Sequence, residues 1–170
     1  YAFVMNPEEG GVAEYKEKVK TFTTTNVDLA KLKAPVYEKF VETTVDDKGV
    51  VNSVKFKNDD TFNFAYDVVD ELARKAPSKT AMIHVTNDKK TRRFTFADLS
   101  RYSAQTANYF ADMGIKKGDR VMLVLKRHYQ FWFSILALHK IGAIVIPATH
   151  LLVEHDFDYR FKAAGVSAIV

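Results

Sequence analysis

The sequence has no cysteine in its 170 residues. This absence excludes disulfide bridges and thiolate chemistry, and it is compatible with the reducing cytoplasm. No apolar run approaches the roughly 18 residues of a membrane span. The first residues also lack the basic and apolar regions of a signal peptide. These absences predict a cytoplasmic protein without a membrane-spanning segment.

Two common phosphate-binding motifs are absent as well. The sequence contains neither G-x-x-x-x-G-K-[ST] nor G-x-G-x-x-G, which excludes a P-loop ATPase and a standard dinucleotide-binding fold. Lys and Arg number 25 against 21 Asp and Glu, a net charge of +4. This mild excess suits an anionic ligand, but it is too small for the electrostatic footprint of a nucleic-acid-binding protein.

The residues that are present make an ordinary globular composition. With 47% hydrophobic and 27% charged residues, the chain is long enough for one sizeable core. We expect residues 1–61 to form an N-terminal arm with short helices at residues 12–22 and from Pro35 onward. A short strand is expected at residues 50–56. Residues 62–170 are predicted to start a larger domain.

A helix and a hairpin are predicted at the beginning of this domain. Apolar residues recur every fourth position from Phe64 to Ala76, and Asn63 precedes them as a good N-cap. The pattern predicts an amphipathic helix with Phe64, Val68, Leu72 and Ala76 facing inward. Strand-like runs at residues 80–86 and 91–96 flank four turn-forming residues, as in a β-hairpin.

The next helix has recognisable signals at both ends. Thr95 is an N-cap residue and Asp98 stands three residues later, which is a variant of the capping box. Gly114, followed by Ile115, predicts a Schellman motif at the other end. The expected buried face consists of Leu99, Tyr102, Thr106, Phe110 and Met113.

The most informative stretch begins with a strand and a helix. Residues 121–125 are all apolar, which is typical of a strand covered on both faces of a parallel sheet. Residues 129–141 then predict a mostly buried helix whose polar stripe is limited to Gln130 and Ser134. Gly142 follows where a left-handed cap is expected.

A second strand at residues 143–146 completes a βαβ crossover, and Pro147 is expected to stop it. A further helix at about residues 154–164 leads to a third strand from Ser167. The fold class is therefore predicted to be α/β, the N-terminal part of a doubly wound parallel sheet with flanking helices. The chain stops inside this third strand, where natural domains rarely end, so we expect a fragment.

Ligands of such sheets bind beyond the carboxyl ends of the strands, so the strand tips are the first candidate sites. Lys126, Arg127 and His128 follow the first strand and supply positive charge for a phosphate. The favoured interpretation is nevertheless a solvated turn with an imidazole that caps the helix. Thr149 and His150 follow the second strand.

Aromatic and histidine residues of the central helix have two interpretations. The run Phe131, Trp132 and Phe133 is expected to pack in the core, with Trp132 as an anchor, and an aromatic binding wall near the strand tips is the alternative. His139 lies on the same apolar face. We expect it to be hydrogen-bonded within the core and to have no catalytic role.

Neither a metal site nor a nucleic-acid site is expected. His150 and His155 are close in sequence but lack a convincing third ligand. The densest basic cluster lies at the expected hairpin tip: Lys89, Lys90, Arg92 and Arg93. No stacking aromatic residues are interleaved with it, so the cluster is interpreted as a solvated turn.

Three segments together resemble the N-terminal part of AMP-forming acyl-CoA synthetases, which belong to the adenylate-forming superfamily. They are FTFADLSRYSAQTANYF, GIKKGDRVMLVLKRHYQFWFSILALHKIGAIVIPATHLL and DYRFKAAGVSAIV. The likeness covers about residues 62–170. The segments FNFAYDVVDELA, FWF and IPATH are most similar to the medium-chain and branched-chain acyl-CoA synthetases.

The resemblance implies a ligase that acts on a small carboxylic acid. ATP activates the carboxylate as an acyl-adenylate with loss of pyrophosphate, using Mg²⁺, and coenzyme A then displaces AMP. The family's phosphate loop, adenine-binding segment and catalytic lysine lie downstream of this sequence. No catalytic residue is therefore assigned here, and the chain alone is expected to be inactive.

The resemblance also implies a coenzyme A rim at residues 147–151. Leu151, with Thr149 and His150, is the expected set of rim residues. Related enzymes often have Gln at the position of Leu151, so a contact there depends on backbone or packing.

A second hypothesis is a non-catalytic ligand-binding or interaction module with a similar βαβ layout, because fold alone does not assign function. Self-association is expected of the chain, since an incomplete sheet leaves an edge strand and apolar surface uncovered.

Overall fold

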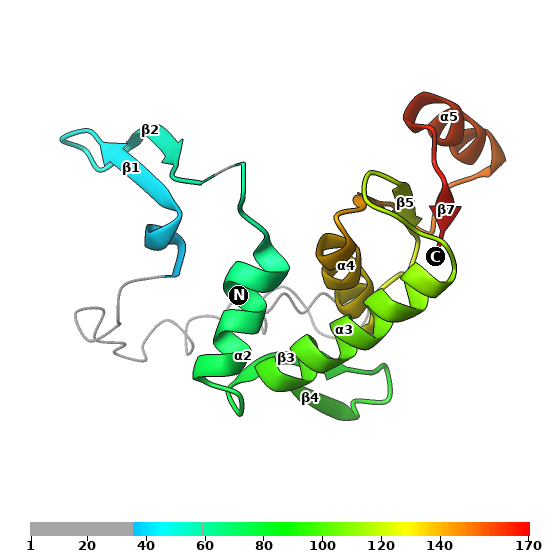
Figure 1. Cartoon of the computed structure of the whole chain (residues 1–170), viewed down its shortest axis with the longest axis horizontal. Coiled ribbons are helices and arrows are strands. Elements are labelled where there is room, and N and C mark those ends of the chain that lie inside the picture. The colour runs from blue at the N-terminus through cyan, green and yellow to red at the C-terminus, as the bar shows by residue number, and fades with distance from the viewer. Residues whose placement is uncertain (1–35, 59) are drawn as a thin grey trace, which may run out of the picture. The chain divides into compact units, whose positions relative to one another are not determined.

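The computed structural model describes residues 36–58 and 60–170 (Figure 1). The chain divides into two compact units, Tyr1–Lys55 and Phe56–Val170. The helix expected at residues 12–22 lies outside the described residues, and the expected division after residue 61 stays a prediction.

The described part of the first unit is a short helical turn followed by a hairpin. The turn η2 spans Val36–Lys39, and the strands are β1 (Val41–Val45) and β2 (Val51–Phe56). The carboxylate of Asp46 stabilises the connecting turn by accepting hydrogen bonds from the backbone amides of Lys48 and Val50, at 2.9 and 2.8 Å. The strand expected at residues 50–56 is confirmed. The helix expected from Pro35 onward is reduced to the single turn η2, and Val41, which was expected in it, belongs to β1. The β-branched run of β1 favours the extended conformation.

The second unit contains the elements that position the candidate site. They are η3 (Ala65–Asp70), α2 (Glu71–Lys75), β3 (Thr80–Val85), β4 (Thr91–Thr95), α3 (Phe96–Asp112), β5 (Arg120–Leu123), α4 (Gln130–Ile141), β6 (Ile144–Pro147), α5 (Glu154–Ala164) and β7 (Ala168–Ile169). β3 and β4 form the predicted antiparallel hairpin.

The first helical segment starts as predicted but buries a different face. Asn63 is confirmed as a capping residue, since its side-chain oxygen accepts a hydrogen bond from the Ala65 amide at 3.0 Å. The buried residues are Ala65 and Val69, whereas Phe64 is 47% exposed. The expected inward face is wrong by one position. η3 is a π-helix, whose wider turn changes the rotation per residue on which the pattern of every fourth residue depends.

Both ends of α3 are confirmed. The Thr95 hydroxyl accepts from the Asp98 amide at 3.1 Å, and the Asp98 carboxylate accepts from the Thr95 amide at 3.0 Å. At the other end, the Ile115 amide donates to the Phe110 carbonyl at 3.0 Å, as in a Schellman motif. Met113 is wrongly placed in the buried face, since it lies beyond the end of α3 and is 67% exposed.

A three-stranded parallel sheet forms the centre of the unit, in the order β6-β5-β7. Its middle strand β5 contains Val121, Met122 and Leu123, which are fully buried. This confirms the strand inferred from the apolar run. Pro147 does not stop β6 from outside but is its last residue, paired with Leu123. Proline is tolerated there because β6 has β5 on one side only in the described sheet.

The sheet is doubly wound. The chain passes from β5 through α4 to β6, and then from β6 through α5 back past β5 to β7. Crossovers between parallel strands are right-handed, so two crossovers that run in opposite directions place α4 and α5 on opposite faces. Figure 1 shows α4 beside α3, and α5 apart from both. The expected α/β fold class is confirmed.

Two hydrophobic clusters hold these layers together, and α4 contributes to both. The first joins α3, β5 and α4 through Ala107, Phe110, Val121, Leu123, Ala137, Leu138 and Ala143. The second joins η3, the hairpin, α3 and α4 through Ala65, Val69, Phe94, Leu99, Phe133 and Leu136. α4 is therefore mostly buried, as predicted, and Ser134 of the expected polar stripe is buried too. By contrast, α5 has no buried residue, so its expected inward face at Phe157, Phe161 and Ala164 is not enclosed.

Candidate functional site

The carboxyl ends of β5 and β6 lie side by side and define the candidate site. Leu123 pairs with Pro147 at these ends, and the Ala148 amide donates to the Leu123 carbonyl at 2.9 Å. The chain leaves the two strands toward opposite faces of the sheet. This arrangement is a topological switch point, and ligands of doubly wound sheets bind in the crevice outside it. We call residues 124–128 the basic loop and residues 148–153 the second loop.

The basic loop carries the positive charge that the sequence placed at the first strand tip. Lys126, Arg127 and His128 are all exposed. The His128 amide donates to the Leu125 carbonyl at 3.1 Å, so the loop is a tight turn. The Phe131 amide donates a hydrogen bond to the His128 carbonyl at 3.1 Å. Among the described residues, no side chain caps the start of α4. The turn is therefore open to solvent, and both interpretations of its charge stay predictions, whereas the expected capping imidazole is wrong among the described residues.

The second loop contains the three residues expected at a coenzyme A rim. Thr149, His150 and Leu151 are all exposed, Leu151 to 75%. The Leu151 amide donates to the Thr149 hydroxyl at 3.3 Å. The pairing of β5 with β6 brings these residues to the same edge of the sheet as the basic loop. Their contact with coenzyme A stays a prediction.

The aromatic run at the start of α4 divides into different environments. Phe133 is buried and lies 5.4 Å from Phe94 and 5.7 Å from Tyr129, measured between ring centroids. Phe131 is partly buried and packs against the first hydrophobic cluster. Trp132 is 52% exposed, so the core anchor is wrong. Tyr129 and Phe133, one helical turn apart, already fill the space against Phe94, and the exposure of Trp132 favours the alternative of an aromatic wall near the basic loop.

His139 lies at the other end of α4, before the amino end of β6. Its Nδ1 is buried and has no hydrogen-bond partner among residues 36–58 and 60–170, so the expected hydrogen bond within the core is wrong. Burial lowers the pKa of the His139 imidazole, because desolvation disfavours the charged form. A neutral ring far from the strand tips gives no reason to assign it a catalytic role.

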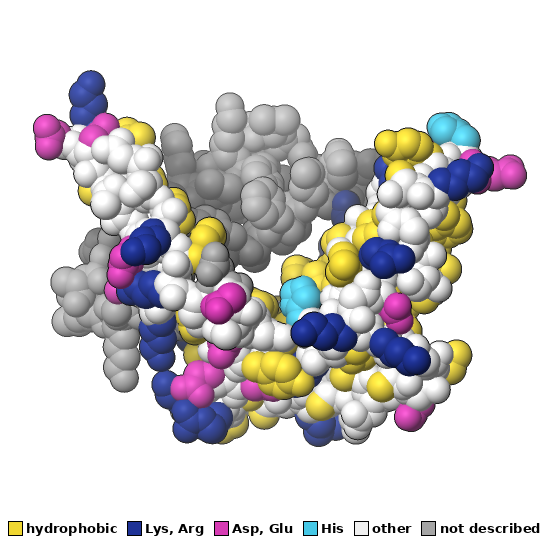
Figure 2. Space-filling model, turned by 45° about the horizontal axis from the view of Figure 1, so that its top comes forward, with side chains coloured by type: hydrophobic (Ala, Val, Ile, Leu, Met, Phe, Trp, Pro, Cys, Tyr) yellow, Lys and Arg dark blue, Asp and Glu magenta, His cyan; other side chains and the backbone are white. Residues whose placement is uncertain are grey.

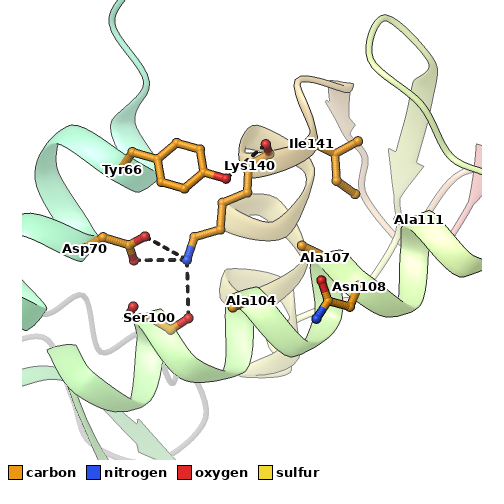
Figure 3. A pocket seen from close by; sticks show the side chains of 9 residues that line it. All are labelled: Tyr66, Asp70, Ser100, Ala104, Ala107, Asn108, Ala111, Lys140 and Ile141. Carbon is orange, nitrogen blue, oxygen red and sulfur yellow. Dashed lines mark hydrogen bonds and ion pairs between the residues drawn. The ribbon is translucent and has the colours of Figure 1, made fainter.

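A hollow of about 400 Å³ lies among η3, α3 and α4 (Figure 3). Its lining residues are Tyr66, Asp70, Ser100, Ala104, Ala107, Asn108, Ala111, Lys140 and Ile141. The Lys140 side chain is only 6% exposed. Its Nζ lies 3.0 and 2.9 Å from the two carboxylate oxygens of Asp70 and 3.3 Å from the Ser100 carbonyl. These acceptors occupy all three donors of an ammonium group, so we interpret the hollow as a joint between helices.

Sequence reasoning missed one contact beside the basic loop. Arg92 of β4 donates from Nη1 to the Tyr129 hydroxyl at 2.8 Å, and its guanidinium lies 4.9 Å from the centroid of that ring. Arg92 had been assigned only to the basic cluster of the hairpin. No spacing rule in the sequence relates two residues on elements so far apart.

The other charged features give no separate site. Lys90 at the hairpin tip is paired with Asp88 at 2.8 Å. Figure 2 shows Lys and Arg side chains scattered over the visible face with acidic ones between them, which does not resemble the continuous basic patch of a nucleic-acid-binding surface. In the described part of the chain, no three His, Asp or Glu residues are grouped to hold a metal ion. The helices of that part include none with the length and apolar character of a membrane span.

Comparison with known proteins gives the family. The family described as AMP-binding enzyme matches residues 69–170, which is more than half of the chain. This chain belongs to the AMP-binding enzyme family. The matched residues include the hairpin, all three parallel strands and both loops of the switch point.

Three relatives illustrate how this chain compares with longer proteins. The acyl-coenzyme A synthetase ACSM5, mitochondrial, of Rattus norvegicus is 36% identical over 115 residues, which are 64% of this chain and 20% of that protein. The crotonobetaine/carnitine–CoA ligase of Salmonella paratyphi A is 37% identical over 101 residues, which are 59% of this chain and 20% of that ligase. The crystal structure of a Brucella canis acyl-CoA synthetase is 28% identical with a TM-score of 0.59, and the match covers 64% of this chain and 20% of that one.

This chain therefore spans about a fifth of the length of the relatives that it matches. Its switch point lies wholly inside the family match. The strand-tip loops are thus the part of this chain where a site of the family is to be sought.

Proposed function

We propose that this chain forms part of an ATP-dependent acyl-CoA synthetase, which converts a carboxylic acid, ATP and coenzyme A into acyl-CoA, AMP and pyrophosphate. The observation that carries the proposal is the 36% identity over 115 residues to a protein named as an acyl-coenzyme A synthetase. The family match over both switch-point loops supports it. Fatty-acid metabolism and a cytoplasmic location belong to the same proposal.

The chemistry of the two loops suits these substrates. ATP and coenzyme A both carry phosphates, and the exposed Lys126 and Arg127 supply positive charge at the switch point. Thr149, His150 and Leu151 on the second loop are the proposed coenzyme A rim, where Leu151 offers only an apolar surface and its backbone. Mg²⁺ is proposed to enter as the ion bound to ATP. In this scheme the residues of the chain bind and orient substrates, and none is assigned to the chemical step.

We also propose that the chain associates with itself when it is alone. β6 and β7 are the outer strands of the described sheet. Ile144 and Ile169, one on each of them, are both 51% exposed. Open edges and exposed apolar side chains of this kind invite pairing with another chain. Light scattering over a range of concentrations measures the mass in solution, and a monomer throughout would contradict the proposal.

Pyrophosphate release tests the ligase. The chain alone and a polypeptide of the relatives' length that contains it are incubated with ATP, Mg²⁺ and short-chain to medium-chain fatty acids. We expect release that depends on the carboxylate only from the longer polypeptide, because the chain lacks a phosphate-binding motif. Robust release by the chain alone would contradict that expectation. Nucleotide binding without any release by the longer polypeptide would favour the non-catalytic binding module.

A further inference from the structure

Tyr129 connects the basic loop to α4, and residues of the β3–β4 hairpin surround its side chain. The ring of His84 lies edge-on at 5.4 Å between centroids, and the ring of Phe94 lies at 5.0 Å. Arg92 donates to the Tyr129 hydroxyl at 2.8 Å and also lies over the ring. His84 and Arg92 are directly paired across the hairpin. The side chains of one hairpin face therefore hold the residue that directly follows the basic loop.

The basic loop depends on anchors at its two ends. At its start, the Val124 amide donates to the Val170 carbonyl at 2.8 Å, which ties the loop to the sheet. Between the anchors, Lys126 has a φ of 35°, a positive value that is uncommon for a residue other than glycine. Such strained backbone persists only where the surrounding structure holds it. The hydrogen bonds described within the loop form a single turn, so its shape depends on where Tyr129 is held.

Arg92 is suited to this anchoring by its chemistry. Its guanidinium carbon lies 5.2 Å from the Phe94 ring centroid and 4.9 Å from that of Tyr129, while one nitrogen donates to the hydroxyl. A planar guanidinium combines stacking on rings with directed hydrogen bonds, whereas an ammonium group acts as a point charge. Lysine at this position therefore preserves the charge but not the whole interaction.

We propose that Arg92 is a positioning residue of the switch-point site, which acts by holding Tyr129 and thereby the basic loop. Arg92 itself is not required to touch a substrate. The identity of the ligand rests on the proposed function, since ATP and coenzyme A are the phosphate-bearing substrates that the basic loop would meet. The mechanical part of the inference rests only on the contacts of Tyr129.

Amide hydrogen exchange in this chain tests the mechanical part directly. We expect Arg92→Ala to speed exchange about tenfold at His128, Phe131 and Trp132, whose amides close the turns around Tyr129. The Ile115 amide at the end of α3 should keep its rate. Arg93→Ala is the matched control, because neighbouring residues of a strand point to opposite faces, and it should leave the loop amides unchanged. Unchanged loop amides in Arg92→Ala, or equal acceleration at Ile115, would overturn the proposal.

Two conservative variants separate anchoring from general packing. Tyr129→Phe keeps the ring and removes only the hydroxyl, and we expect about threefold faster exchange at the same loop amides. Arg92→Lys should give an effect between those of the wild type and Arg92→Ala. The double variant of Arg92→Ala with Tyr129→Phe should exchange no faster than Arg92→Ala alone, since both changes break the same contact. Additive effects would mean that the two residues act separately and would refute the anchor.

Kinetics in a polypeptide of the relatives' length test the functional part. Arg92→Lys should raise the KM for coenzyme A or ATP about fivefold and change kcat less than twofold, as expected for a residue that places a binding loop. A fall in kcat with unchanged KM would overturn the proposal that Arg92 positions a binding loop. If the wild-type polypeptide releases no pyrophosphate, the proposed function fails, while the hydrogen-exchange result still decides whether Arg92 holds the loop.

Discussion

Replacing Asp70 by Asn tests how η3 is joined to α4. The ammonium of Lys140 lies 3.0 and 2.9 Å from the carboxylate oxygens of Asp70 and is almost completely buried. Without the negative charge, Lys140 keeps the Ser100 carbonyl at 3.3 Å and the face of the Tyr66 ring at 5.6 Å. Neither partner carries a full charge. The substitution therefore leaves a buried cation without the counter-ion that Figure 3 shows beside it.

The geometry sets the expected magnitude. Removing one partner of a buried ion pair costs about 3–5 kcal/mol. The Asp70 side chain is 27% exposed, so water replaces part of the lost interaction, and we expect a loss of about 2–3 kcal/mol in the free energy of unfolding. That is a large share of the roughly 5–15 kcal/mol of a typical domain. The exposed pair Lys162–Asp158, with side chains 75% and 60% exposed, is the matched control, and Asp158→Asn should cost only about 0.3–0.5 kcal/mol.

Urea unfolding measures both losses in the second unit, with the fluorescence of Trp132 as the probe. Trp132 is the single tryptophan of the chain, so the signal comes from α4. A second variant, Asp70→Leu with Lys140→Met, removes both charges and should recover most of the stability, because apolar replacements of buried ion pairs are often neutral. Equal losses for Asp70→Asn and Asp158→Asn would refute the reasoning. A double variant as unstable as Asp70→Asn would also refute it.

Four other substitutions test separate parts of the structure. Thr95→Ala removes the acceptor of the Asp98 amide and should cost about 1 kcal/mol in urea unfolding, and an unchanged midpoint would contradict the cap. Burial lowers the pKa of His139, so the stability contributed by its neutral form is complete above the unfolded value of about 6.5 and is lost as the pH falls toward the folded pKa. His139→Leu should remove this loss, and parallel stability curves for the two proteins below that pH would show that the imidazole does not titrate as described. Trp132→Ala should cost clearly less than the about 3–5 kcal/mol of a buried aromatic residue, and a loss of that full size by thermal unfolding would restore the core anchor. In a polypeptide of the relatives' length, Leu151→Glu should raise the KM for coenzyme A more than that for ATP, whereas equal effects would assign Leu151 to stability alone.

Local interactions explain why many elements could be predicted. The capping box of Thr95 and the left-handed cap at Gly142 involve residues within a few positions of one another, so the sequence contains both partners of each interaction. The apolar run of β5 indicates a strand that is buried on both faces. The order of strands and helices then indicates a parallel sheet. The same order placed the candidate site at the two strand tips, where the carboxyl ends of β5 and β6 do meet.

Packing between distant elements determined what the sequence could not. Because η3 is a π-helix, its buried residues lie one position after those that the apolar pattern predicted. Tyr129 and Phe133 occupy the space in the core that Trp132 was expected to fill. Asp70 and Lys140 are 70 residues apart in the chain, and Arg92 and Tyr129 are 37 apart. Residues that far apart meet only after whole helices and strands have packed, and periodicity within one element contains no information on its neighbours. The sequence by itself therefore determined most elements of the second unit and the edge of the sheet where the site lies, and only the tertiary structure decided which side chains hold that edge in place.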